Sequence, residues 1–228
     1  MSRSQSLVLF DIDGTLMRGA GPHHKSALVE GVRRITGLTT TLDGFPTQGM
    51  LDGDLLAAML RAAGHDESAI QSDLDAIAAE CQRCYLANCA QDLRPYVCVG
   101  VEPVLAELHT RGVALGLVTG NFSAIGWKKV ELAGLRRYFS TGAFAEDGAT
   151  RASLAKIAVE RASDAGLLAG SYRVSLIGDH TNDIGAAKAN DFQSIGVATG
   201  LTSLEELLAA QPDIAVRDLR ELEISRLL

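Results

Sequence analysis

The residues that could perform chemistry come directly after three short apolar runs. Asp11 and Asp13 follow the first run, Thr119 follows the second, and Asp179 and Asp183 follow the third. If these runs are parallel strands, their carboxyl ends meet at one edge of a sheet, which is where ligands bind in open α/β folds. Clustered carboxylates repel one another unless a cation neutralises them, and oxygen ligands favour Mg²⁺. The spacing therefore predicts a magnesium site, through which an anionic phosphate can bind.

Parallel strands joined by helices are needed to bring these residues together. The apolar runs that read as buried strands are Leu7–Phe10, Ala114–Val118, Val174–Ile177 and Ser194–Ala198, with a weaker run at Asp213–Val216. After residue 100, helical patterns alternate with them at Glu102–Arg111, Ser123–Gly134, Arg151–Gly166, Asn182–Asn190 and Ser203–Ala209. This alternation predicts an α/β fold with a Rossmann-like parallel sheet covered by helices on both faces.

The segment between the first two strands breaks this alternation. Residues 23–90 show only helical stripes and no convincing strand, and breaker-rich crossings at Gly19–Pro22 and Arg94–Gly100 enclose them. We therefore expect an all-helical cap subdomain at residues 19–94, inserted into a core formed by residues 1–18 and 95–228.

Asp11-Ile-Asp-Gly-Thr-Leu16 resembles the leading motif of the haloacid dehalogenase-like hydrolase superfamily. Thr119 is similar to the second motif, and the run from Gly178-Asp179 to Asp183 is similar to the fourth. The position of the helical insertion resembles the phosphoglycolate phosphatase-like branch. The resemblance covers nearly the whole chain and implies a Mg²⁺-dependent phosphatase that acts through an aspartyl-phosphate.

The resemblance also implies roles for single residues. Asp11 would be the nucleophile, and Asp13 would protonate the leaving alcohol, activate water and bind the metal through its backbone carbonyl. Asp11 and Asp179 would hold the metal through their carboxylates, with Asp183 beside them. The phosphoryl oxygens would be bound by the Thr119 hydroxyl and by backbone N–H groups around Gly120 and Asn121.

The family's third motif supplies a cation, for which this chain offers two candidates. Arg151 stands at the start of an expected helix that faces the strand ends, and we prefer it as the phosphate-binding cation. Lys156 lies more than a turn further along and is the second choice. In the polar loop at residues 39–49, Thr47 and Gln48, together with Asp52, are candidates for substrate selection.

Composition and net charge limit the classes of partner that we expect the chain to bind. The 228 residues carry a net charge of −7 without a basic block, which disfavours a nucleic-acid or anionic membrane partner. No apolar stretch is long enough to span a bilayer or to form a signal-peptide core, so we expect a cytoplasmic protein. The four cysteines, Cys81, Cys84, Cys89 and Cys98, lack the two close pairs of a zinc site, and we interpret them as buried free thiols.

Two other functions remain open from the sequence. A sugar phosphomutase of the same superfamily would use the same catalytic residues, and a non-catalytic module could bind a phosphate ligand in the same cradle. The presence of both Asp11 and Asp13 favours an enzyme over the binding module. The sequence thus favours a phosphatase for a small phosphorylated metabolite, and it contains no signature of oligomeric state.

Overall fold

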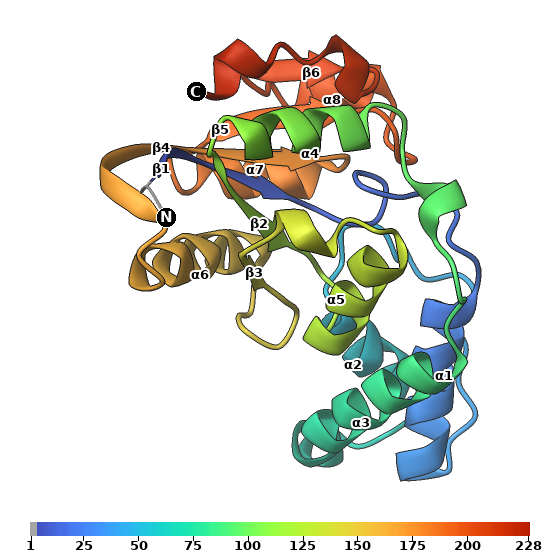
Figure 1. Ribbon diagram of the computed structural model, residues 1–228. Coiled ribbons are helices and arrows are strands. Elements are labelled where there is room, and N and C mark those ends of the chain that lie inside the picture. Colours follow the sequence, from blue (N-terminus) through green and yellow to red (C-terminus); the bar gives the residue numbers. More distant parts are fainter. Residues whose placement is uncertain (1–3) are drawn as a thin grey trace.

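A computed structural model describes residues 4–228 of the chain. It contains one parallel sheet of six strands in the order β3-β2-β1-β4-β5-β6 (Figure 1). The strands are β1 (Ser4–Phe10), β2 (Ala114–Val118), β3 (Thr141–Ala143), β4 (Leu168–Gly178), β5 (Gln193–Val197) and β6 (Ile214–Val216). The prediction of an α/β fold with a Rossmann-like parallel sheet is confirmed.

Helices cover both faces of the sheet. Successive residues of a strand point to opposite faces, so each central strand packs against helices on both sides. Val8 and Phe10 of β1 pack with α4 (Val101–Thr110) and with the end of α5 (Ser123–Leu132). Leu7 and Leu9 pack on the other face with α6 (Arg151–Asp164) and α7 (Thr181–Lys188). Helix α8 (Leu204–Ala209) lies between β5 and β6 in the chain. The central strand β1 is therefore buried on both sides, which explains its continuous apolar sequence.

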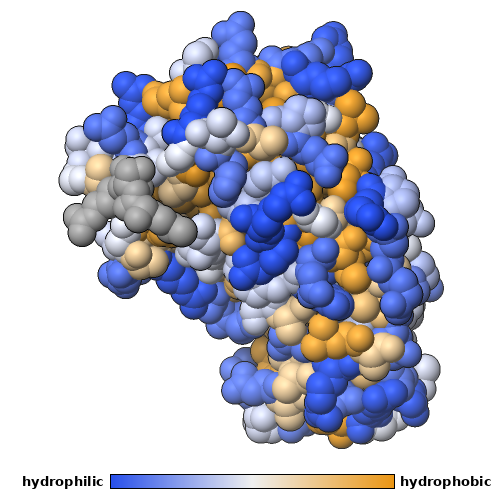
Figure 2. Space-filling model, in the orientation of Figure 1, coloured by the Kyte–Doolittle hydropathy of each residue, from blue (hydrophilic) through white to orange (hydrophobic). Residues whose placement is uncertain are grey.

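The remaining helices are α1 (His23–Thr36), α2 (Asp52–Ala62) and α3 (Glu67–Asn88), all between β1 and β2 in the chain. They pack around buried residues of their own, including Leu28, Leu56 and Ile77, and this cluster also takes in Phe122 and Ile125 at the start of α5. In Figures 1 and 2 these helices form a smaller lobe beside the sheet. The structure describes no strand in residues 23–90. The division into a core and a cap at residues 19–94 stays a prediction.

Four of the expected strands and all five expected helices after residue 100 are present, and the weak run at 213–216 forms β6. The ends shift by one or a few residues, except that β4 begins at Leu168, well before the expected start at Val174. Strand β3 was not expected. It has three small residues, Thr141, Gly142 and Ala143, and pairs only with β2 at the edge of the sheet. A strand of this length carries no periodic pattern.

All four cysteines are free in the structure. Cys81, Cys84 and Cys89 are buried and Cys98 is partly exposed, in line with the interpretation as free thiols. Within residues 4–228, no helix combines the length and the apolar character needed to cross a membrane.

Candidate active site

The ends of three neighbouring strands place the candidate residues at one edge of the sheet. Phe10 of β1 is in register with Leu117 of β2 and with Ile177 of β4, so the residues that follow these strands emerge side by side. The backbone N–H of Asp11 donates a hydrogen bond to the carbonyl of Ile177 at 3.0 Å, which continues the pairing one residue past β1. Asp11, Thr119 and Asp179 all line the same pocket.

Three buried carboxylates form a cluster, of which Asp11 and Asp179 line this pocket. Asp11, Asp179 and Asp183 each offer an oxygen atom, and these atoms lie within 4.8 Å of one another. The backbone closes around them: a Cβ atom at Gly14 or at Gly200 would overlap the Asp179 carboxylate. One oxygen of Asp183, Oδ1, is buried without a hydrogen-bond partner. Three hard oxygen ligands, and a buried Asp183 oxygen that accepts no hydrogen bond, fit a small divalent cation such as Mg²⁺.

The electrostatics of the cluster also fit a cation. Burial raises the pKa of Asp11 to about 7, and the neighbouring carboxylates of Asp183 and Asp13 add to this, while Arg151 offsets part of it. Burial, with repulsion from Asp11 and Asp183, raises the pKa of Asp179 to about 8. The pKa of Asp183 is raised as well, mainly by burial. Protein groups alone therefore do not keep all three carboxyls ionised at neutral pH.

Arg151 is the cation that the structure brings to this cluster. It is the first residue of α6, after the capping residue Thr150, and its side chain is 9% exposed. Its Nη1 donates to Oδ1 of Asp11 at 2.8 Å, and its Nε lies 3.4 Å from Oδ1 of Asp183. Lys156 is not brought to the pocket: its side chain is 71% exposed and lies 4.0 Å from Glu160. Of the two candidates, only Arg151 is placed to contact a phosphate bound at Asp11.

The turn after β2 meets the loop that precedes α2. Thr119 is buried, and its Oγ1 accepts a weak hydrogen bond of 3.4 Å from the backbone N–H of Asn121. Gly120 lies against Met50, whose carbonyl a Cβ atom at residue 120 would overlap. The carbonyl of Gly120 accepts a hydrogen bond of 2.7 Å from the backbone N–H of Asp52. Gly120 thus lets the loop approach the strand end closely.

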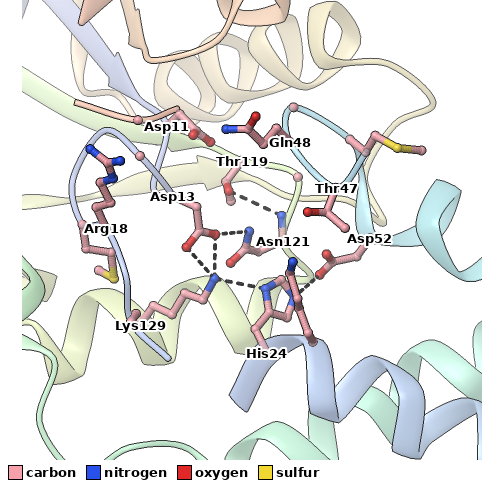
Figure 3. Close-up of a pocket in the computed structure, with 18 of the residues that line it drawn as sticks. Asp11, Asp13, Arg18, His24, Thr47, Gln48, Asp52, Thr119, Asn121 and Lys129 are labelled. Atoms are coloured by element: carbon pink, nitrogen blue, oxygen red, sulfur yellow. Dashed lines mark hydrogen bonds and ion pairs between the residues drawn. The ribbon is translucent and has the colours of Figure 1, made fainter. Parts of the chain in front are cut away.

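The same loop lies over the pocket. Thr47 and Gln48 line it (Figure 3), and their role in substrate selection stays a prediction. Asn182 of α7 donates a hydrogen bond of 2.9 Å to the carbonyl of Gly49. The pocket has a volume of about 440 Å³ and extends from the carboxylate cluster to α1 and α3. This volume suits a small organic ligand.

Asp13 also lines the pocket, and its side chain is 45% exposed. Both of its carboxylate oxygens accept from Nζ of Lys129, at 2.8 and 2.6 Å, and Oδ2 also accepts from Nδ2 of Asn121 at 2.8 Å (Figure 3). Desolvation alone would raise the pKa of Asp13, but Lys129 and His24 outweigh it, and the pKa is lowered.

Lys129 was missed by the sequence reasoning, although a signal was present. It lies on α5 in step with the buried residues Ile125, Gly126 and Val130, so a charged residue occupies the apolar face of the helix. A buried lysine requires a partner. Asp52 also lines the pocket, and its carboxylate, which is 2% exposed, contacts Nε2 of His24 and the backbone N–H of Phe122, both at 2.9 Å. Its contribution to substrate choice stays a prediction.

Comparison with known proteins agrees with this arrangement. The family model of haloacid dehalogenase-like hydrolases matches residues 5–191 of the chain. Over 212 residues the chain is 26% identical to phosphoglycolate phosphatase of Agrobacterium fabrum (strain C58), with 93% of this chain and 88% of that protein aligned. It is 28% identical over 207 residues to tyrosine-protein kinase PtkA of Mycobacterium tuberculosis, where 86% of this chain aligns with 63% of that protein.

Solved structures share the fold at lower identity. The crystal structure of β-phosphoglucomutase from Clostridium difficile superposes with a TM-score of 0.73 at 17% identity, covering 98% of this chain and 95% of the other. The similarity extends over the sheet and the helices inserted after β1. It concerns the fold, and the chemistry has to be argued from the residues in the pocket.

Proposed function

The chain belongs to the haloacid dehalogenase-like hydrolase family, and we propose that it is a Mg²⁺-dependent phosphatase that removes phosphate from a small phosphorylated metabolite. One observation carries this proposal above the others. Asp11 contacts Arg151 and belongs to a buried cluster of three carboxylates, and Asp13 lines the same pocket. The groups that would serve as nucleophile, phosphate-binding cation, metal ligands and acid–base group thus lie together at one edge of the sheet.

In the proposed reaction, a carboxylate oxygen of Asp11 attacks phosphorus, and the bond to the leaving oxygen breaks. Asp13, whose pKa is lowered by Lys129 and His24 despite burial, is ionised at rest and takes up a proton from solvent when the ester binds. It gives this proton to the leaving oxygen, so that an alcohol leaves and Asp11 carries the phosphate as an acyl phosphate. Asp13, now ionised, takes a proton from a water molecule, whose oxygen attacks the same phosphorus. Inorganic phosphate leaves, and Asp11 and Asp13 return to their starting states.

Other groups of the pocket would bind the transferred phosphate. Arg151 would contact its equatorial oxygens, and the hydroxyl of Thr119, with backbone N–H groups near Gly120 and Asn121, would donate to them. Asp11, Asp179 and Asp183 would hold Mg²⁺ with the backbone carbonyl of Asp13. When bound there, the cation would neutralise the carboxylates, keep Asp11 ionised and offset the charge of the phosphate.

The size of the pocket supports a small substrate. A volume of about 440 Å³ accommodates a metabolite, and the net charge of −7 favours neither a nucleic acid nor an anionic membrane as partner. We propose a cytoplasmic enzyme acting on a free metabolite.

Phosphate release from p-nitrophenyl phosphate and a panel of phosphorylated metabolites tests the proposal, with and without Mg²⁺. We expect turnover that requires the metal and disappears in Asp11→Asn, a substitution that keeps the size of the side chain. Phosphate exchange between positions of a sugar, without release to water, would instead identify a phosphomutase. A folded wild-type protein that binds phosphate but turns over no ester would identify a binding module.

A further inference from the structure

Lys129 is a buried lysine whose position the reaction above does not explain. Its side chain is 3% exposed, whereas the carboxylate it contacts, Asp13, is 45% exposed and faces the pocket. Burial of an ammonium group is unfavourable unless the group is paired and hydrogen-bonded. A lysine buried at this place therefore indicates that the Asp13 carboxylate has to be held in one particular position.

Each proton of the Lys129 ammonium has an acceptor. Two acceptors are the carboxylate oxygens of Asp13, at 2.8 and 2.6 Å, and the third is Nδ1 of His24, at 3.1 Å. An ammonium group only donates, so Nδ1 of His24 accepts and its Nε2 carries the proton. That Nε2 donates to Oδ2 of Asp52 at 2.9 Å. The hydrogen-bond requirements thus assign the tautomer of His24.

Asp52 is held in turn by the protein backbone. Its Oδ2 also accepts from the backbone N–H of Phe122 at 2.9 Å, and its own N–H donates to Gly120 at 2.7 Å. The result is a continuous chain of contacts from Asp52 through His24 and Lys129 to Asp13 (Figure 3). These residues come from the start of α2, from α1, from α5 and from the turn after β1.

Asn121, in the turn after β2, also contacts Asp13: its Nδ2 donates a hydrogen bond to Oδ2 of Asp13 at 2.8 Å. The carboxylate therefore has three contacts from Lys129 and Asn121, although nearly half of the side chain is open to the pocket. An exposed aspartate without such partners would sample several rotamers. In this protein, the contacts from Lys129 and Asn121 together fix the orientation of the Asp13 carboxylate.

We propose that Lys129 is a positioning residue, which holds the Asp13 carboxylate on the leaving-group side of Asp11 and is itself held by His24 and Asp52. The assignment rests on the proposed function of Asp13 as the acid that protonates the leaving oxygen. Proton transfer requires the acid to lie within hydrogen-bond reach of that oxygen, so a loosely held Asp13 transfers its proton less often.

Two substrates distinguish this role from a general structural one. An alkyl phosphate such as glycerol phosphate needs a proton on its leaving oxygen, whereas nitrophenolate leaves p-nitrophenyl phosphate without one. The ratio kcat/KM covers the steps up to release of the leaving group, so later hydrolysis of the acyl phosphate does not affect it. For Lys129→Met we expect kcat/KM to fall about 100-fold on the alkyl phosphate and to stay within about threefold on the nitrophenyl ester.

Neighbouring variants serve as controls. Lys128→Met removes the adjacent lysine, which lies 3.1 Å from the exposed Glu131. This variant should leave kcat/KM unchanged on both the alkyl phosphate and the nitrophenyl ester. Lys129→Arg keeps two or more donors toward Asp13 and should restore part of the loss on the alkyl phosphate. An equal fall on both substrates in Lys129→Met, or no fall on the alkyl phosphate, would overturn the proposal.

A crystal structure of Lys129→Met gives a readout that does not depend on turnover. We expect the Asp13 side chain to leave its present rotamer or to occupy several, whereas in Lys128→Met it stays in place. If wild type hydrolyses neither ester, the proposed function fails, while the structure of the variant still decides whether Lys129 positions Asp13. An unmoved Asp13 in Lys129→Met would overturn the inference even in an active phosphatase.

Discussion

Arg151 reaches across 140 residues of sequence to place its Nη1 2.8 Å from Oδ1 of Asp11. The pair is buried on both sides, with 9% and 6% of the two side chains exposed. The guanidinium thus lies beside the proposed nucleophile, where the charge of a bound phosphate would develop.

This geometry leads us to expect different effects at the two candidate cations. Arg151→Met should lower kcat/KM about 100- to 1,000-fold, because a charge-bearing donor to the transferred phosphate is lost. Lys156→Met should have no measurable effect, since Lys156 is exposed, pairs with Glu160 and does not line the pocket. Steady-state kinetics on one ester measures both, with circular dichroism as the check on folding. Equal activity in the two variants would remove Arg151 from the reaction.

The acidic cluster predicts a pH-dependent stability for the metal-free protein. The ordinary carboxyl pKa of 3.8 is raised on folding to about 7 at Asp11 and about 8 at Asp179. A carboxyl with a raised pKa binds its proton more tightly in the folded state, so its stabilising effect is complete below about 3.8 and is lost as pH rises through about 7 to 8.

We therefore expect the unfolding temperature in EDTA to fall between pH 5 and pH 9, with Mg²⁺ raising it more at the upper end. Thermal unfolding across this pH range, with EDTA or Mg²⁺, measures the effect. Asp179→Asn removes one of the responsible carboxyls and should flatten the curve in EDTA. A Mg²⁺ effect that is the same at both ends of the range would contradict this view of the cluster.

Gly14 and Gly19 offer a matched test of the metal site. Both have a positive φ, +95° and +71°, so alanine strains the backbone at either position. Only at Gly14 would the added Cβ overlap the Asp179 carboxylate, while nothing lies within 4 Å at Gly19. Gly14→Ala should weaken Mg²⁺ binding about 10- to 100-fold, the range seen when support around metal ligands is disturbed. Calorimetric titration with Mg²⁺ should show Gly19→Ala close to wild type, and equal affinities in both variants would refute the assignment.

The loop before α2 should influence which esters are used. Gln48 lines the pocket, so Gln48→Ala should change the ranking of substrates in a metabolite panel. Asp43 lies in the same loop but does not line the pocket, and Asp43→Ala serves as the control. If the relative kcat/KM values of all substrates stay unchanged in Gln48→Ala, this loop does not select the substrate.

The sheet could be predicted well because its central strands are buried on both faces. Leu7–Phe10 and Ala114–Val118 are continuous apolar runs, and parallel pairing then places Asp11 and Thr119 at one edge. Strand β3 could not be predicted, since Thr141–Ala143 is short, small in side chains and paired on one side only. Register at the edge depends on contacts that no local pattern encodes.

The sequence could predict those residues of the candidate site that directly follow a strand. Lys129 and His24 follow no strand: their importance arises from helices α5 and α1 meeting at Asp13, which is a tertiary contact. Such a contact becomes visible only when the two helices are placed. Arg151 differs, because the sequence already placed it at the start of a helix facing the strand ends and favoured it over Lys156.

The most direct measurement of the central claim is mass spectrometry of the enzyme quenched in acid during turnover of p-nitrophenyl phosphate. In Asp13→Ala the first step proceeds without a proton donor, because nitrophenolate is a good leaving group, whereas hydrolysis of the acyl phosphate lacks its base. We expect phosphate on the peptide that contains Asp11 to accumulate in this variant and to be absent in Asp11→Asn. Turnover without phosphate on Asp11, or with phosphate on another residue, would contradict the claim that Asp11 is the nucleophile.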